Sequence, residues 1–227
     1  MKNIIKNEFQ GWKVWETLWL LGTSVIMIGL SIYWKDSLMG IISATTGMAY
    51  VVCTGKGKLC AYFFGLINSV LYAIISYHAK LYGETMLNLF YYVPMLVVGF
   101  FSWLKHMNEE TKEVSKRSMK ALGRGIMIAS IALGTLGYGF VLKWMGDSMP
   151  FVDSFTTVAS VVAMILTVKM YAEQWWIWFF VDLVTIYMWW TSFKVGQDNM
   201  ATLVMWIMYL LTAILMGVKW EKEAKKL

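Results

Sequence analysis

Long runs of apolar residues, separated by short polar stretches, dominate the chain. A helix needs about 20 such residues to cross roughly 30 Å of hydrocarbon, and a helix satisfies its own backbone hydrogen bonds there. None of the runs shows the alternation that is typical of barrel strands. We therefore predict an all-α, polytopic membrane bundle with eight transmembrane helices, over residues 17–34, 38–53, 59–77, 82–103, 122–142, 151–168, 174–193 and 200–218.

Composition agrees with a bilayer as the solvent. Of the 227 residues, 59% are hydrophobic and only 15% are charged, which exceeds the usual apolar share of a water-soluble domain. Most connections are very short, and the stretch over residues 105–120 is the only long polar loop. We expect a single compact helical domain with no soluble domain attached.

The distribution of basic residues predicts the orientation. Of the 20 Lys and Arg residues, 16 lie at the termini and in every second loop, and four lie on the opposite side. The positive-inside rule then places both termini of a multi-pass membrane protein in the cytoplasm. A basic rim facing lipid headgroups accounts for the net charge of +6, so no nucleic acid partner is expected. The first apolar run is too long for a cleaved signal.

The sequence holds little that would support a cofactor or a metal. Cys53 and Cys60 lie at the predicted cytoplasmic edge, match no metal-ligand spacing and are expected to be structural thiols. No G-x-x-x-x-G-K-[ST] loop is found, so ATP does not drive this chain directly. We expect no cofactor, no metal ligand and no catalytic residue.

The chain repeats itself weakly at a shift of 115 residues. "ATTGMAYVVCTGKGK" from Ala44 then lies over "ASVVAMILTVKMYAE" from Ala159, and Tyr72 falls on Tyr187. One span lies between the two triplets, so both enter the membrane from the same face as a parallel repeat. The predicted organisation is an N-terminal segment with an extra helix (1–37), a first triplet (38–104), a loop and linker helix (105–145), a second triplet (146–220) and a tail (221–227).

Each triplet carries a polar residue at mid-depth. Asn68 and Asp182 both lie about 14 Å into their helices at ~1.5 Å per residue, near the midplane of the bilayer. An aspartate there costs about 2.5 to 3.5 kcal/mol, so packing alone would not select it. Polar midpoints in two repeats are typical of a secondary transporter. The residues that share the Asp182 face at helical spacing are Trp175, Trp178, Thr185 and Trp189.

Structural roles for the same residues stay open. Asn68 also fits a side chain that joins two helices by a hydrogen bond, and Trp175 also fits an aromatic belt. Asp182 also fits a protonated structural carboxyl. Asp153 fits either a helix cap or an external gate. Pro94 predicts a kink in mid-span.

Two stretches resemble the signature regions of the PnuC family of vitamin transporters, which carry nicotinamide riboside into bacteria. They are "YFFGLINSVLYAIISYHAKLYGETMLNLFYY" and "VDSFTTVASVVAMILTVKMYAEQWWIWFFVDLVTIY". The Phe-Gly-Leu-Ile-Asn run ending at Asn68 and the Trp-x-x-Trp-x-x-x-Asn/Asp pattern of Trp175, Trp178 and Asp182 are the most specific parts. The resemblance covers residues 40–220 and implies a three-plus-one-plus-three fold similar to SWEET carriers, assembled as a homotrimer.

The resemblance also implies a pocket for the vitamin, with its ring near Trp175 and Trp178. Many family members have Asn in place of Asp182 and Gln in place of Asn88, so the polar contacts of this chain differ. The substrate-binding residues implied are Trp175, Trp178, Asp182, Asn68, Asn88 and Tyr72, and the possible gate or secondary contacts are Glu84, Tyr91, Asp153, Thr185, Tyr187 and Tyr209.

The expected function is facilitated diffusion of nicotinamide riboside by alternating access. Trapping by a cytoplasmic ribosylnicotinamide kinase follows, and proton coupling through Asp182 is the competing mechanism. Similar family members carry thiamine, riboflavin or deoxynucleosides, and these substrates remain alternatives. An intramembrane enzyme is disfavoured because the chain lacks clustered acids or histidines. A scaffold does not explain polar midpoints in both repeats.

Overall fold

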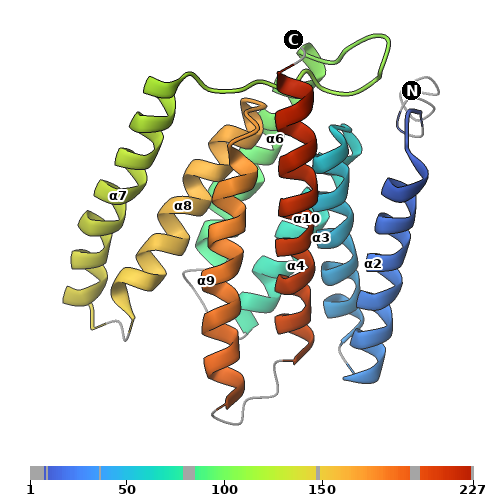
Figure 1. Ribbon diagram of the computed structural model, residues 1–227. Helices are drawn as coiled ribbons and strands as arrows, with labels where there is room; N and C mark the ends of the chain where they lie inside the picture. The colour runs from blue at the N-terminus through green and yellow to red at the C-terminus, as the bar shows by residue number, and fades with distance from the viewer. Residues whose placement is uncertain are drawn as a thin grey trace. The chain divides into compact units, whose positions relative to one another are not determined.

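The described part of the chain is helical. The computed structural model describes residue 8 and residues 10–35, 37–78, 85–146, 149–194 and 200–225. Within these ranges the only β pairing consists of two isolated bridges. The helices (Figure 1) are α2 (Val14–Tyr33), α3 (Leu38–Lys56), α4 (Cys60–His78), η1 (Leu87–Tyr92), α6 (Val93–Lys105), α7 (Ala121–Trp144), α8 (Pro150–Val168), α9 (Gln174–Lys194) and α10 (Met200–Ala224).

The eight predicted spans correspond to these helices, with η1 and α6 together forming one span. Seven spans in the described residues are long and apolar enough to cross a membrane. The remaining predicted span is α9. Its 21 residues are enough for a crossing, but its five tryptophans and Asp182 make it less hydrophobic than the other seven. The prediction of an all-α, polytopic bundle is confirmed.

The first compact unit of the chain spans Met1–Ser115. In it α2 packs against α3, α3 against α4, and α4 against both η1 and α6, as antiparallel neighbours (Figure 1). Glycine allows the closest approach, because a Cβ added at Gly99 of α6 would lie 2.3 Å from the Tyr62 ring of α4. Tyr62 in turn packs edge-on against Trp103, with ring centroids 5.1 Å apart.

The second compact unit spans Lys116–Leu227. Here α7 packs against α8, α8 against α9, and α9 against α10. Ala159, Ala163 and Leu166 of α8 form a buried cluster with Ile177 and Val181 of α9. Most of α7 is exposed within this unit, including large apolar side chains such as Leu133 and Trp144, as expected of a helix that faces lipid or another protein surface.

The loop between α6 and α7 bonds to the same kind of turn in each unit. In the first unit, the Val114 N–H donates to the carbonyl of Gly57, which follows α3, at 2.9 Å. In the second, the Arg117 N–H donates to the carbonyl of Met170, which follows α8, at 2.8 Å. Gly57 and Met170 both adopt left-handed backbone conformations, with φ of 82° and 63°. Each unit thus contributes an α-helical C-terminal turn that the loop covers.

Pro94 does not produce a simple kink in an α-helix. The six residues before Val93 form the π-helix η1, and the Val93 N–H bonds to the carbonyl of Asn88, five residues back. A wider turn suits this position because Pro94 has no N–H to donate to the preceding turn. The α-helical spacing expected of this span therefore does not hold over Leu87–Tyr92.

A buried ion cluster joins three parts of the first unit. Lys56, at the end of α3, is only 2% exposed and lies 2.7 Å from the carboxylate of Glu16 in α2 and 2.8 Å from that of Glu113 in the loop. The Lys56 ammonium also donates to the carbonyl of Gly11. The cluster ties the additional N-terminal helix to the rest of the unit.

We predict that Gly99→Ala destabilises the first unit. The added methyl group would overlap the Tyr62 ring, so the packing of α4 on α6 must shift at a cost of about 1 to 3 kcal/mol. Gly29→Ala is the matched control, because a Cβ at Gly29 meets nothing within 4 Å. Thermal unfolding in detergent measures both, and an equal midpoint for the two variants would contradict the close contact.

We also predict that Lys56→Gln lowers stability by about 3 to 5 kcal/mol, because its removal leaves the carboxylates of Glu16 and Glu113 without a counter-charge. The double variant Glu16→Gln with Lys56→Gln should recover much of that loss. Unfolding midpoints of the two single variants and the double variant complete the cycle. Additive effects would mean that the pair does not interact energetically.

Candidate functional site

Asp182 is the ninth residue of α9 and lies in the interior of the second unit. The residue is 2% exposed. No hydrogen bond or ion pair from the described residues reaches its carboxylate, whereas Glu173, at the start of the same helix, accepts bonds from Ser118, Met119 and Arg124. A buried carboxylate without a donor is unusual, since buried charges are normally paired.

Trp175 is buried at the start of α9, against α10. Its ring packs edge-on to that of Trp220, with centroids 5.9 Å apart, and its Cβ lies 3.1 Å from where a Cβ at Gly217 would be. The indole N–H of Trp175 has no acceptor among the described residues. Trp175 therefore belongs to the packed interior and not to a lipid-facing aromatic belt, and it retains an unused donor.

Trp178 is half-buried, one turn further along α9. It packs against the apolar cluster formed by α8 and α9, together with Met127 and Ile131 of α7. Trp178, Asp182 and the half-buried Thr185 follow one another at helical spacing, as predicted. The Thr185 hydroxyl donates to the carbonyl of Val181 at 2.8 Å, so its donor is already used.

Asn68 joins α4 to α3 in the first unit. Its Nδ2 donates to the Ser43 carbonyl at 2.7 Å and contacts the Ser43 hydroxyl at 3.2 Å. This is the helix-joining role considered for Asn68. Both contacts use Nδ2, so among the described residues Oδ1 can accept a further bond in addition to this structural role.

Asn68 and Asp182 occupy equivalent positions in their helices. Asn68 is the ninth residue of α4, which begins at Cys60, and Asp182 is the ninth residue of α9, which begins at Gln174. At the shift of 115, Asn68 falls on residue 183, and this offset of one residue from Asp182 disappears when the helices are counted from their starts. The two midpoints differ in chemistry, because Asn68 has a protein partner and Asp182 has none in the described residues.

Three further predicted residues lie in the first unit. Asn88 is buried in η1, while Tyr91 in the same π-turn and Tyr72 on α4 are half-buried. All three have other interactions within the protein. The π-turn sets the direction in which Asn88 points, and such turns are frequent at functional sites.

The remaining predicted contacts are less central. Glu84 lies outside the described residues. Asp153 is half-buried in the first turn of α8, but the N-cap of that helix is Met149, so the interpretation of Asp153 as the cap is wrong. Tyr187 is largely exposed. Tyr209 of α10 is half-buried and packs edge-on against Trp206 at 5.6 Å.

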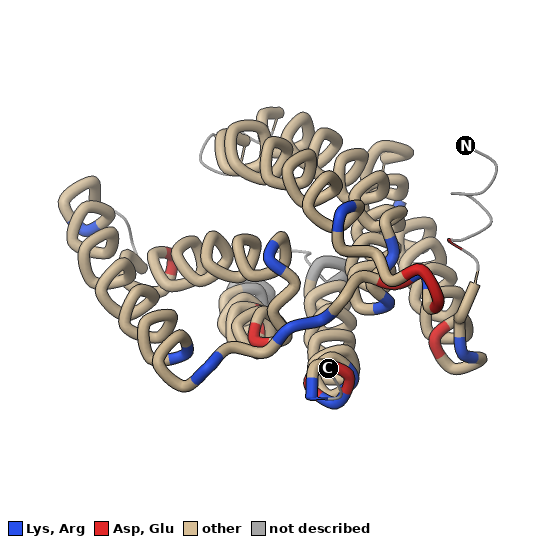
Figure 2. Tube along the Cα trace, turned by 90° about the horizontal axis from the view of Figure 1, so that it is seen from above, with Lys and Arg blue, Asp and Glu red and all other residues tan. Residues whose placement is uncertain are grey.

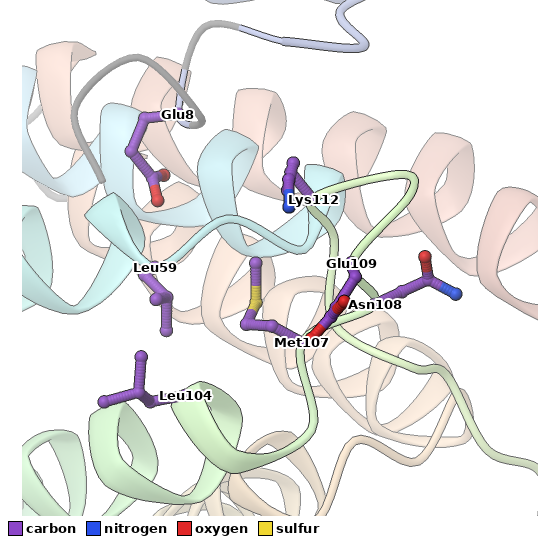
Figure 3. Close-up of a pocket in the computed structure, with 7 residues that line it drawn as sticks. All are labelled: Glu8, Leu59, Leu104, Met107, Asn108, Glu109 and Lys112. Atoms are coloured by element: carbon purple, nitrogen blue, oxygen red, sulfur yellow. The ribbon is translucent and has the colours of Figure 1, made fainter. Parts of the chain in front are cut away.

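Two clefts in the first unit do not contain the predicted residues. One, of about 130 Å³, lies where the loop meets α6 (Figure 3). The other, of about 210 Å³, is apolar and lies between α4 and η1. Both are below the roughly 300 Å³ of a typical small-molecule site. The first is lined by Glu8, Leu59, Leu104, Met107, Asn108, Glu109 and Lys112, and the second by Val70, Ala73, Ile74, Tyr77, Thr85 and Leu89.

Charged residues lie mainly at helix ends and in the loop (Figure 2). Lys58 is one of them, fully buried, with its Nζ donating to the Lys112 carbonyl at 2.8 Å. Burial lowers the pKa of Lys58, and the negative charges of Glu113 and Glu8 act in the opposite direction. The spans themselves contain few charged residues that could bind a ligand, and Asp182 in the middle of α9 is one of them.

Comparison with known proteins identifies the family. The family described as "Nicotinamide mononucleotide transporter" matches residues 37–222. The chain belongs to this family. It is 39% identical over 223 residues to the nicotinamide riboside transporter PnuC of Neisseria mucosa, covering 96% of this chain and 85% of that protein. It is 30% identical to the Haemophilus influenzae protein of the same name, covering 98% and 96%.

A solved structure supports the same assignment. The crystal structure of "the Vitamin B3 transporter PnuC" superposes with a TM-score of 0.85 at 38% identity, covering 97% of both chains. Membership of the nicotinamide mononucleotide transporter family confirms the resemblance to PnuC proteins and agrees with a carrier rather than an enzyme.

Sequence reasoning missed two features of the candidate site. Ser43 of α3 was not singled out as the partner of Asn68, although a small polar residue in an apolar helix is a signal for such a contact. The π-helix around Asn88 was also missed. The only sequence signal for this π-helix was Pro94, six residues after Asn88.

We predict that Asn68→Ala lowers the free energy of unfolding by about 0.5 to 1.5 kcal/mol, because α4 loses its hydrogen bonds to α3. Ser43→Ala is the matched control. It removes the weaker contact but keeps the backbone carbonyl that Asn68 donates to, so it should have a smaller effect. Thermal unfolding of the purified protein measures both, and a larger loss in Ser43→Ala would argue against the carbonyl contact.

Proposed function

We propose that this protein carries nicotinamide riboside across the bacterial inner membrane by facilitated diffusion. Its relatives in Neisseria mucosa and Haemophilus influenzae are nicotinamide riboside transporters and match almost the whole chain. The observation that carries the proposal is the α9 face on which the unpaired Asp182 carboxylate follows two indoles at helical spacing. Nicotinamide riboside is a flat pyridinium cation, and this face offers both a negative charge and aromatic surfaces.

The physical chemistry favours a flat cation. A desolvated cation–π contact contributes up to about 2 kcal/mol, and the carboxylate adds a charge that has no resident partner among the described residues. Riboflavin is neutral and would leave that charge uncompensated. Thiamine is also a flat cation, so direct comparison of the vitamins is part of the test.

We propose that substrate contacts come from Trp175, Trp178, Asp182, Asn68, Asn88 and Tyr72. The unused indole donor of Trp175 and the unused acceptor of Asn68 support this set. Tyr91, Asp153, Thr185, Tyr187, Tyr209 and Glu84 are secondary or gating candidates.

Transport is proposed to proceed by alternating access in a homotrimer with both termini in the cytoplasm. A cytoplasmic ribosylnicotinamide kinase would trap the product, because a phosphorylated nucleoside is no longer the carrier's substrate. The excess of basic residues at the termini and in every second loop supports the orientation.

We predict that nicotinamide riboside binds the purified protein and that Trp178→Ala weakens this binding about tenfold or more, because one aromatic face is lost. Binding of labelled nicotinamide riboside, thiamine and riboflavin to the same preparation measures affinity and preference. Counter-flow of labelled nicotinamide riboside in proteoliposomes then tests carriage, since only a carrier exchanges unaltered substrate.

Trp144→Ala is the matched control, because Trp144 is 86% exposed at the end of α7. It should bind like the unaltered protein. Equal affinities of Trp178→Ala and Trp144→Ala, with both folded, would rule out a contact at Trp178. Tighter binding of riboflavin than of nicotinamide riboside would overturn the proposed substrate.

A further inference from the structure

The carboxylate of Asp182 is buried without a counter-charge of its own. The other two buried acids of the described residues are paired: Glu16 with Lys56, and Glu173 with Arg124. Asp182 is as buried as these residues, yet no described donor reaches it. This difference calls for an account of how its charge is compensated.

The helices packed against α9 supply no cation at the depth of Asp182. These helices are α8 and α10. α8 contains no Lys, Arg or His, and its only acid is Asp153 in the first turn. In α10, Gly217 lies beside Trp175, so Lys219 is level with the start of α9, roughly 13 Å from Asp182 along the helix axis at ~1.5 Å per residue. The other titratable groups are Tyr187 and Lys194 on α9, and Tyr209, Glu221, Lys222 and Glu223 on α10.

The other described spans offer no mid-depth cation either. Every basic residue in them lies within six residues of a helix end, away from the middle of the span where Asp182 lies. To pair with Asp182, one of these basic side chains would have to extend from a helix end to the middle of the span. The basic residues in the described spans are Lys56, His78, Lys105, Arg124, Lys143, Lys194, Lys219 and Lys222.

An isolated carboxylate in a medium of low dielectric constant becomes neutral by taking up a proton. We propose that Asp182 carries a proton in the empty carrier and exchanges it for the positive charge of the substrate. In this step the carboxylic acid releases one proton to water, and the resulting carboxylate pairs with the pyridinium cation. No bond of the substrate changes, and charge balances on both sides. The inference rests on the proposed function, which supplies the cationic substrate, and it concerns the binding equilibrium and not a coupling of transport to a proton gradient.

Two consequences follow from this exchange. Protons and substrate compete for one carboxylate, so the apparent Kd rises as pH falls, by up to about tenfold per pH unit where the empty site is protonated. The site also selects charge and not only shape. The 1,4-dihydro form of nicotinamide riboside is nearly the same size but neutral, and it gains nothing from the carboxylate.

The test uses the full-length purified protein. Affinity for nicotinamide riboside is measured between about pH 5.5 and 8.5, and proton release is measured by calorimetry in buffers of different ionisation enthalpy. We expect tighter binding at higher pH, release of about one proton per substrate at the acid end of this range, and a preference of about tenfold or more for the pyridinium over the dihydro form.

Asp182→Asn should abolish proton release, flatten the pH dependence and remove the preference for the cation. Glu110→Gln, which removes an acid from the exposed loop, should retain all three. If Asp182→Asn does not fold, the measurement of proton release by the unaltered protein is by itself the test of the exchange. Binding that is independent of pH and releases no proton would overturn the exchange and leave the proposed function standing, whereas absence of nicotinamide riboside binding at every pH would overturn both.

Discussion

Compensation of buried polar groups is the constraint on which the rest of this structure depends. Helices that lie in hydrocarbon satisfy their own backbones, so each polar side chain inside must find a partner of its own. Lys56 is held by Glu16 and Glu113, Glu173 by Arg124 and Ser118, and Asn68 by Ser43. Asp182 differs from these residues, because its carboxyl group has neither a donor nor a counter-charge among the described residues, and the proposed substrate is a cation.

The same constraint explains why the spans could be predicted from the sequence. A run of about 20 apolar residues has few alternatives to a helix, and the predicted limits of α8 and α9 agree with the structure to within one residue at each end. The helical period likewise placed Trp178 and Asp182 on one face of α9. α10 continues six residues beyond its predicted end at 218. The prediction followed the apolar run, and the charged residues after that run are still helical.

Features that depend on contacts distant in sequence could not be predicted. The partner of Asn68 lies 25 residues away on another helix, and no local pattern connects it to Ser43. The π-turn at Asn88 arises from one additional residue before Pro94, which the 3.6-residue period cannot reveal. The burial of Trp175 depends on Gly217, which has no side chain and so allows α10 to pack closely against α9 at this point. A sequence pattern does not show which glycine has this role.

The ion cluster at Lys56 has a consequence for the history of the chain. Lys56 in α3 is neutralised partly by Glu16, which belongs to the additional N-terminal helix α2. A chain without this helix would keep Glu113 beside Lys56 but would lose the second carboxylate at this turn. Gain or loss of α2 during evolution should therefore have been accompanied by a change of residue at the position of Lys56, so that the two sites vary together across species.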